Sequence, residues 1–197
     1  MKYIATLLAT LLHLQAGSPA PPNPAVLKAK QEFEAKKTEA TKGDPATLFE
    51  LGDLYYFGKG TSRNFGEALK AYQAAAEKGY VLAEANLGYL YERGQGTGRD
   101  YKKAMEWYSK AAEKGHAESQ ANLAELYYSS KGLPKRDFVN AWKWYKIAGE
   151  LGHKEAKLFA PKVQALLREP QVTPDQKTKV EAEVKVWLEG YKKKQTS

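Results

Sequence analysis

Cysteine is absent from all 197 residues of the chain. The protein therefore has no disulfide bond, no thiol nucleophile and no thiolate metal ligand, and its stability must come from an apolar core. We also expect no lipoprotein anchor, because that modification needs a cysteine. The composition, with 43% hydrophobic and 27% charged residues, suits a soluble globular domain or a short repeat array.

The apolar run at the N-terminus is too short to span a bilayer. It extends from Ile4 to Leu14, follows Lys2 and precedes small residues from Ala16 onward, which is the layout of a secretory signal peptide. We predict a signal peptide at residues 1–16, cleaved after Ala16, and hence a periplasmic or secreted protein. The alternatives are an N-terminal membrane anchor and a helix that packs into the fold.

Positive charge exceeds negative charge. The formal net charge is +8, and it becomes +7 when residues 1–16 are removed. The cationic residues are scattered among Glu and Asp, and the one run of three is Lys192 to Lys194 in a basic tail at 192–197, a pattern typical of a solvated tail. This charge is compatible with weak contact with an anionic envelope surface. We expect no nucleic-acid partner, because no motif for one accompanies the charge.

The sequence repeats itself with a period of 36 residues. Lys-Gly pairs mark the period at Lys42-Gly43, Lys78-Gly79 and Lys114-Gly115, and Leu151-Gly152 follows 37 residues later. Between these marks the same residue types recur, namely Leu51, Leu87 and Leu123; Tyr55, Tyr91 and Tyr127; Ala68, Ala104 and Ala141; and Tyr72, Tyr108 and Tyr145. A fixed period of this size is typical of a solenoid, in which each unit buries its apolar face against its neighbours.

Each unit is expected to contain two helices. In the first, apolar residues recur at helical spacing, as in Ala83, Leu87, Leu90 and Tyr91. A glycine inside such a helix is less favourable than alanine by ~1 kcal/mol, so Gly88 indicates close approach by a neighbouring helix. The second helix follows a polar residue that can cap it, which is Asn64, Asp100 or Asp137.

These features predict an all-α solenoid of about three helix-turn-helix repeats with a capping helix at each end. The array at 44–153 divides into repeats at 44–79, 80–115 and 116–152. Before it we place a Pro-rich linker at 17–25 and an N-terminal capping helix at 26–43. After it we place a partial fourth repeat at 154–170 and a C-terminal capping helix at 171–191.

The end of the array carries two proline signals. Pro161 predicts a short or kinked helix in the partial fourth repeat. Thr173, Pro174 and Gln176 predict the capping box that begins the final helix. The apolar face of that helix is wide enough to close the exposed end of the last repeat, and consists of Val180, Val184, Trp187, Leu188 and Tyr191.

We predict no catalytic, cofactor-binding or metal-binding residues, and no cofactor. No Ser, His and acid arrangement can be assembled, and the carboxylates are distributed as helix-surface charges. Gly58 to Thr61 lacks the spacing and the strand of a phosphate loop and is interpreted as a turn between helices. His116 and His153 follow a helix-ending glycine in successive units, which favours a repeated structural position over a metal pair.

Several motifs carry a resemblance to a known family. They are Leu87-Gly88-Tyr89-Leu90-Tyr91, Gly94-Gln95-Gly96, Asp100-Tyr101, Ala104, Trp107-Tyr108 and Ala111-Ala112-Glu113-Lys114-Gly115-His116. With their counterparts they cover about residues 40 to 160 and resemble the Sel1-like repeat family, whose units are similar to tetratricopeptide repeats. The third unit departs from the pattern at Ala124, Ser130 and Gly149 and has one extra loop residue. The resemblance implies a right-handed α-α superhelix that acts as an adaptor, scaffold or regulatory binding partner.

The tetratricopeptide geometry implied by this resemblance places one side of each first helix on a concave surface. The residues expected there, as contacts for a protein or peptide partner, are Phe49, Glu50, Asp53, Tyr56, Asn86, Tyr89, Glu92, Arg93, Asn122, Glu125, Tyr128 and Lys162. Tyr and Asn suit peptide recognition, because a rigid ring adds contact area and an amide can pair with a peptide backbone.

The leading hypothesis is an exported, monomeric, non-catalytic scaffold that binds a protein segment through the concave face, in envelope assembly or regulation. The first alternative is a cell-envelope enzyme or an inhibitor that acts on cell-wall material. The second is a basic surface-binding protein that uses Lys192 to Lys194.

Overall fold

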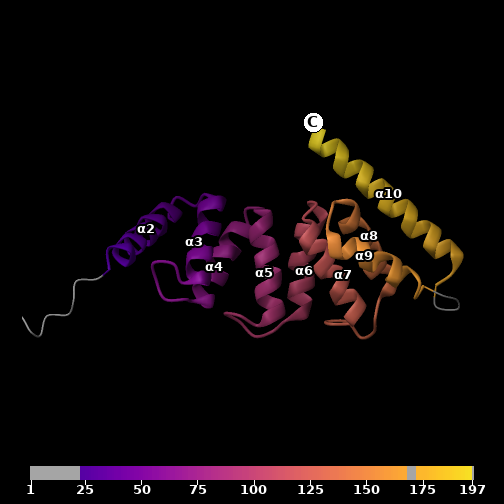
Figure 1. Ribbon diagram of the computed structural model, residues 1–197, viewed down its shortest axis with the longest axis horizontal. Helices are drawn as coiled ribbons and strands as arrows, with labels where there is room; N and C mark the ends of the chain where they lie inside the picture. The colour runs from indigo at the N-terminus through magenta and orange to yellow at the C-terminus, as the bar shows by residue number, and fades with distance from the viewer. Residues whose placement is uncertain (1–22, 168–171, 197) are drawn as a thin grey trace, which may run out of the picture.

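The computed structural model describes residues 23–167 and 172–196, and this part of the chain folds into nine α-helices with no strand. The helices stand side by side in a row, and the last one starts at the end of the row and runs diagonally back above it (Figure 1). The predicted signal peptide, most of the predicted linker and residues 168–170 of the predicted fourth repeat lie outside the described residues.

The helices pair into hairpins in chain order. Their bounds are α2 Pro24–Ala40, α3 Pro45–Phe57, α4 Phe65–Ala76, α5 Val81–Arg93, α6 Tyr101–Glu113, α7 Ala117–Ser129, α8 Phe138–Glu150, α9 Lys154–Gln164 and α10 Pro174–Thr196. The two helices of each hairpin pack on each other, α4 contacts α5, and α6 contacts α7. Every hairpin therefore packs against its successor, as the repeat period predicts, and the all-α solenoid is confirmed.

The capping residues predicted from the sequence begin the second helices. The side chains of Asn64, Asp100 and Asp137 each accept a hydrogen bond from the backbone N–H three residues later, at 3.0 to 3.1 Å. Thr173 Oγ1 accepts from the N–H of Gln176, whose side chain accepts from the N–H of Thr173. These bonds satisfy amides that have no partner within the helix, so they fix where each helix begins.

The N-terminal capping helix begins earlier than predicted. Helix α2 starts at Pro24, because the Asn23 side chain accepts from the N–H of Ala25 and Pro24 occupies the first helical turn. A proline is well tolerated there, since its missing N–H would have no helical partner. The predicted linker at 17–25 therefore extended two residues into the helix.

The core follows the predicted stripe, except in the first unit. Leu87, Leu90, Leu123 and Leu126 are fully buried between hairpins, with 0% exposure. Their counterparts in the first unit, Leu51 and Leu54, are half-buried. The difference arises because the first unit is covered on its N-terminal side by one helix, α2, rather than by a complete hairpin.

The described part of the predicted fourth repeat consists of α9 and the residues that follow it up to Leu167, which is buried. Helix α9 has 11 residues, two fewer than α7, and it contains Pro161 in its interior. A proline there removes one helical hydrogen bond. The prediction of a short helix is confirmed.

Helix α10 differs from the predicted end cap. Val180 and Val184 are buried in the core formed with α8 and α9, while Trp187 meets Trp144 edge to face with ring centres 6.4 Å apart. Further along, the Tyr191 ring lies against Gly115, at the end of α6. The helix therefore runs back along the second helices of the array, because its apolar stripe is longer than the end of the last hairpin.

The predicted basic tail is also part of this helix. Lys192 to Lys194 belong to α10, which continues to Thr196. These three lysines are exposed, as expected of a solvated segment, but they lie in the last turn and a half of a helix rather than in a separate tail. Among the described helices, none combines the length and the apolar character needed to cross a membrane.

We expect Gly88→Ala to destabilise the array, because the new Cβ would lie 2.5 Å from Cδ1 of Tyr108. Gly190→Ala is the matched control: it is also helical, and nothing lies within 4 Å of its new Cβ. Both variants gain helix propensity, so the difference in their free energies of unfolding measures the overpacking, which we expect to be about 1 to 3 kcal/mol. Urea unfolding followed by circular dichroism makes the measurement, and equal stabilities would refute the close packing.

Candidate functional site

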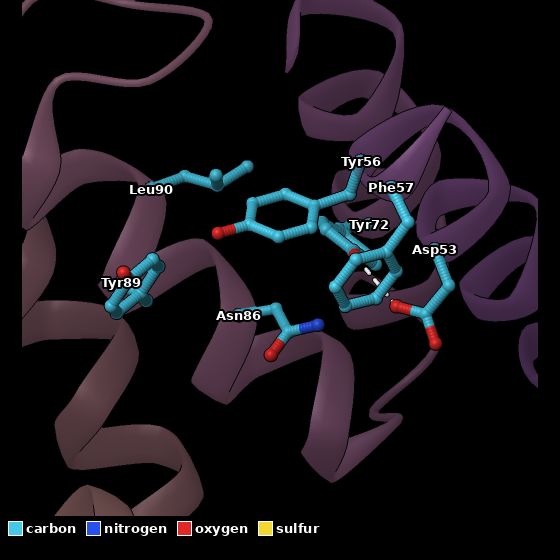
Figure 2. Close-up of a pocket in the computed structure, with 7 residues that line it drawn as sticks. All are labelled: Asp53, Tyr56, Phe57, Tyr72, Asn86, Tyr89 and Leu90. Atoms are coloured by element: carbon cyan, nitrogen blue, oxygen red, sulfur yellow. Dashed lines mark hydrogen bonds between the residues drawn. The ribbon is translucent and has the colours of Figure 1, made fainter. Parts of the chain in front are cut away.

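A small pocket opens between the first helices of the first and second units. Its volume is about 240 Å³, and seven residues line it, namely Asp53, Tyr56 and Phe57 of α3, Tyr72 of α4, and Asn86, Tyr89 and Leu90 of α5 (Figure 2). Four of the predicted partner-binding residues meet here: Asp53, Tyr56, Asn86 and Tyr89. The sequence analysis did not select Phe57, Tyr72 or Leu90 for this site.

One wall of the pocket is fixed by a hydrogen bond between the two helices of the first unit. The Tyr72 hydroxyl donates to Asp53 Oδ1 at 2.6 Å, as the dashed line in Figure 2 marks. Burial and this hydrogen bond raise the pKa of Tyr72 above its usual range. Burial also raises the pKa of Asp53, although its hydrogen bond with Tyr72 opposes the shift. These two groups satisfy each other and hold the wall in place.

The opposite side of the pocket is formed by two tyrosines from different units. The Tyr56 ring points from α3 toward Tyr89 and Leu90 of α5 (Figure 2), and its hydroxyl donates to Oε1 of Gln95 at 3.4 Å. Burial raises the pKa of Tyr56, and the neighbouring Tyr89 raises it further. The Tyr89 ring is 37% exposed and lies under the guanidinium of Arg93, 5.4 Å from ring centre to Cζ. Both rings are therefore positioned before any ligand arrives.

The pocket exists because the second unit reverses a pair of residues. The buried tyrosine of each second helix donates to an acid of the first helix, in the pairs Tyr72–Asp53 at 2.6 Å, Tyr108–Glu92 at 3.0 Å and Tyr145–Glu125 at 2.8 Å. In the first and third units the acid comes three residues before a tyrosine, as Asp53–Tyr56 and Glu125–Tyr128. In the second unit the order is Tyr89–Glu92.

This reversal moves the exposed ring of the second unit by about one helical turn. The acid of that unit is Glu92, and the tyrosine that remains at the surface is Tyr89. The shift brings Tyr89 next to Tyr56, which a strict repeat would not do. The pocket is thus a departure from the repeat, visible in the sequence as one exchanged pair.

The remaining predicted site residues lie outside this pocket. The Phe49 ring packs in the core against Tyr72 and Tyr80, at centre distances of 5.6 and 5.2 Å. Glu50 is ion-paired with Lys36 of α2 at 2.7 Å, which ties the capping helix to the first unit.

Further along the array, Glu92 and Glu125 accept the tyrosine hydrogen bonds described above, and Asn122 is half-buried on α7. The Tyr128 ring packs against Phe138, with centres 5.7 Å apart. Lys162 lies on α9, 5.0 Å above the Phe159 ring. These positions do not extend the pocket.

Phe57 is the residue with the clearest signal that the sequence analysis missed. It ends α3 and is 53% exposed, although it is a large apolar residue. The corresponding positions in the next two units are Arg93 and Ser129. An apolar residue at a position that is polar in both other units is a sign of a specific surface, which comparison of the repeats could have detected.

The two repeated histidines act as helix caps. Nδ1 of His116 accepts from the N–H of Ser119 at 3.2 Å, and Nδ1 of His153 accepts from the N–H of Ala156 at 3.1 Å. Burial lowers the pKa of His116, which favours the neutral ring that this bond requires. Within residues 23–167 and 172–196, no group of three His, Asp or Glu side chains could hold a metal ion.

The fold and this pocket define an α-helical repeat protein with a surface site between consecutive units. Its units match the Sel1 repeat at residues 45–80, 81–116 and 117–153, which together make up more than half of the chain. The protein belongs to the Sel1 repeat family. Proteins of this family generally act as scaffolds for protein–protein interaction. The matched units begin one residue after the boundaries placed from the Lys-Gly pairs.

Solved structures show the same architecture. A Sel1 repeat protein from Oxalobacter formigenes is 30% identical, with a TM-score of 0.64 over 84% of this chain and 64% of that chain. The protein c5321, a protective antigen of uropathogenic Escherichia coli with an SLR fold, is 36% identical, with a TM-score of 0.61 over 64% of this chain and 27% of that chain. This chain thus corresponds to about a quarter of c5321 and to just under two thirds of the Oxalobacter protein.

A more distant structure shares the fold alone. Cysteine rich protein B of Helicobacter pylori is 22% identical, with a TM-score of 0.54 over 66% of this chain and 96% of that chain. The comparison with curated proteins gives no match.

We expect Tyr72, Tyr108 and Tyr145 to be the last tyrosines to ionise. Burial and a neighbouring carboxylate raise the pKa of each above its usual range. Above pH 10 the unfolded chain loses these protons while the folded chain keeps them, so the stability should fall as the pH rises. Absorbance of the ionised phenol, recorded during native and urea-unfolded titrations, makes the measurement.

Tyr108→Phe is the control for this titration, because it keeps the packed ring and should remove one late-ionising group. If all tyrosines of the folded protein ionised near pH 10 with unchanged circular dichroism, the three buried hydrogen bonds would be wrong.

Proposed function

We propose that this protein is an exported, non-catalytic scaffold that binds a segment of another protein on the concave face of its repeat array. The family to which it belongs supports the scaffold role. The pocket between α3 and α5 supports the location, because it brings together two tyrosines, a phenylalanine and an asparagine on a surface formed by consecutive units.

The chemistry of the pocket favours a peptide ligand. Tyr56, Phe57 and Tyr89 supply rigid ring surface, which loses little conformational entropy on binding. Asn86 supplies one amide with both donors and an acceptor, which can pair with a peptide backbone. Asp53 and Tyr72 are bonded to each other, so the pocket does not have to reorganise when a ligand enters.

The size of the pocket decides between a small molecule and a peptide side chain. Sites for drug-sized ligands have volumes of roughly 300 to 1,000 Å³, and this pocket has about 240 Å³. One aromatic or branched aliphatic side chain fits such a volume, while the rest of the partner lies on the surface around it. This single observation carries the proposal that the site anchors one residue of a protein segment.

The location of the protein is part of the same proposal. The charged N-terminus, the apolar run and the small residues that follow support export, with cleavage after Ala16. We therefore place the scaffold in the periplasm or outside the cell, where it takes part in envelope assembly or regulation.

Crosslinking and pulldown from the native envelope test the pocket. Tyr89→Ala removes the exposed ring at small cost to the fold, because the ring is 37% exposed, and recovery of the partner should fall about tenfold if this ring is an anchor contact. Leu158→Ala is the matched control, since Leu158 is 65% exposed on α9 and lies far along the array from the pocket.

Tyr89→Phe provides the second comparison. It keeps the ring and removes the hydroxyl, so recovery close to that of the unmodified protein is expected if contact area dominates. Equal recovery of the same partner by Tyr89→Ala, Leu158→Ala and the unmodified protein would exclude the pocket as the binding site.

A further inference from the structure

The positive charge that is scattered along the sequence gathers at one edge of the array. The segments that join the two helices of each unit carry seven cationic residues when Arg93, the last residue of α5, is included: Lys59 and Arg63 in 58–64, Arg93 and Arg99 in 93–100, and Lys131, Lys135 and Arg136 in 130–137. Their two acidic residues are the helix caps Asp100 and Asp137. We call this edge the loop edge. The turns between units, at 40–44, 76–80, 112–116 and 149–153, carry three lysines and four acidic residues. The two edges therefore have formal charges of +5 and −1.

The loops of this edge form a continuous row. They lie along the lower side of the array in Figure 1, and the turns between units lie along the upper side. Each loop packs on the preceding unit: Gly96 is so close to the start of α4 that a Cβ would lie 2.3 Å from the carbonyl oxygen of Phe65. Gly132 approaches Tyr101 at the start of α6 in the same way. This packing holds the cationic side chains on ordered backbone.

All four arginines of residues 23–167 and 172–196 lie on the loop edge, and each stacks on a ring. The distances from the guanidinium Cζ to the ring centre are 5.8 Å for Arg63 on Phe65, 5.4 Å for Arg93 on Tyr89, 5.9 Å for Arg99 on Tyr101 and 5.8 Å for Arg136 on Tyr128. All four side chains are exposed. Stacking restricts the guanidinium but leaves its N–H groups available.

None of these arginines forms an ion pair with a residue in the described part of the chain. The acids beside them are already engaged, since Asp100 accepts from the N–H of Lys103 and Asp137 from the N–H of Asn140. The loop edge therefore presents four exposed arginines whose N–H groups are not engaged by a carboxylate of the described residues.

Two cations from consecutive units converge at the centre of the loop edge. The guanidinium of Arg99 and the ammonium of Lys131 are each 5.9 Å from the centre of the Tyr101 ring. Both cations therefore flank the same ring, and an anionic group beside Tyr101 would be attracted by each of them.

We propose that the loop edge binds an extended acidic segment of a partner protein, with carboxylates on the stacked arginines. The planar fork of arginine pairs with a carboxylate through two parallel hydrogen bonds. A lipid surface fits less well, because two of the three loops, at 58–63 and 94–99, offer no apolar side chain for insertion, and the third offers only Leu133 and Pro134.

The repeat also sets the spacing of the carboxylates. Packed helices lie about 8 to 10 Å apart, so consecutive loops, two helices apart, are separated by roughly 16 to 20 Å. An extended chain covers that distance in about six residues. The partner segment should therefore carry acidic residues at intervals of about six.

Fluorescence anisotropy with a labelled synthetic peptide tests this proposal. The probe is an extended, Pro- and Ser-rich peptide of about fourteen residues, with Glu pairs about six residues apart. We expect the full-length protein to bind it, more weakly as salt is raised, and Arg99→Gln/Lys131→Gln to bind at least tenfold more weakly. Lys192→Gln/Lys193→Gln is the matched control, because it removes the same charge from exposed positions of α10 and should retain the affinity.

The other outcomes are decisive as well. Equal loss in both double variants would overturn the proposal, because it would mean that net charge alone attracts the peptide. Absence of binding would also overturn it, as would preferential binding to anionic lipid vesicles. Arg99→Lys keeps the charge and loses the fork, so it should weaken binding less than Arg99→Gln combined with Lys131→Gln. Asn86→Ala changes the pocket without removing a ring on which a cation stacks, so it should bind the acidic peptide normally, which separates this surface from the pocket of the proposed function.

Discussion

The tyrosine of each second helix, packed on a small residue of the first, is the contact on which the whole array depends. In the second unit Tyr108 lies against Gly88 so closely that one added methyl group would overlap its ring. The ring is 1% exposed, and its hydroxyl is bonded to an acid of the first helix. One side chain thus sets both the distance between the helices and their alignment along the axis.

That contact also determines which residues reach the surface. The buried tyrosine needs an acceptor, and each first helix provides one acid and one tyrosine three residues apart, which lie on the same face of the helix. The acid accepts the hydrogen bond of the buried hydroxyl, and the other residue lies toward the surface, where Tyr89 is 37% exposed while Tyr56 and Tyr128 are half-buried. Reversal of the pair in the second unit therefore changes the surface without a change in the fold. The pocket between Tyr56 and Tyr89 is a consequence of this one exchange.

Much of the fold could be predicted because its determinants are local in sequence. The caps at Asn64, Asp100 and Asp137, the leucine stripe and the box at Thr173 each involve residues within a few positions of one another. Features that depend on distant contacts were not predictable in this way. The path of α10 depends on its contacts with Trp144 and Gly115, and the half-burial of Leu51 depends on what covers the first unit.

The candidate site, like the fold, was predictable from the sequence only in part. Asp53, Tyr56, Asn86 and Tyr89 were selected by their place in the repeat, and they do meet at one pocket. Glu50 and Phe49 occupy equivalent faces, but a lysine of α2 and the ring of Tyr72 engage them first. Repeat position alone gives the face of a helix, whereas the neighbours decide whether a residue on that face is free to bind.

The loop edge illustrates why charge must be considered in three dimensions. Along the sequence its seven cations are separated by helices that contain many acids, so the chain appears evenly mixed. The solenoid places every loop on one side and every turn on the other, and the mixture separates into a basic edge and a nearly neutral one. The pocket and the loop edge share backbone, because α5 carries Tyr89 of the pocket and leads into the loop whose Gly96 lies against the start of α4. A partner segment anchored by one side chain at Tyr89 would have Arg93 beside it, stacked on the same ring, so an acidic residue next to the anchor would reach the loop edge without any rearrangement of the scaffold.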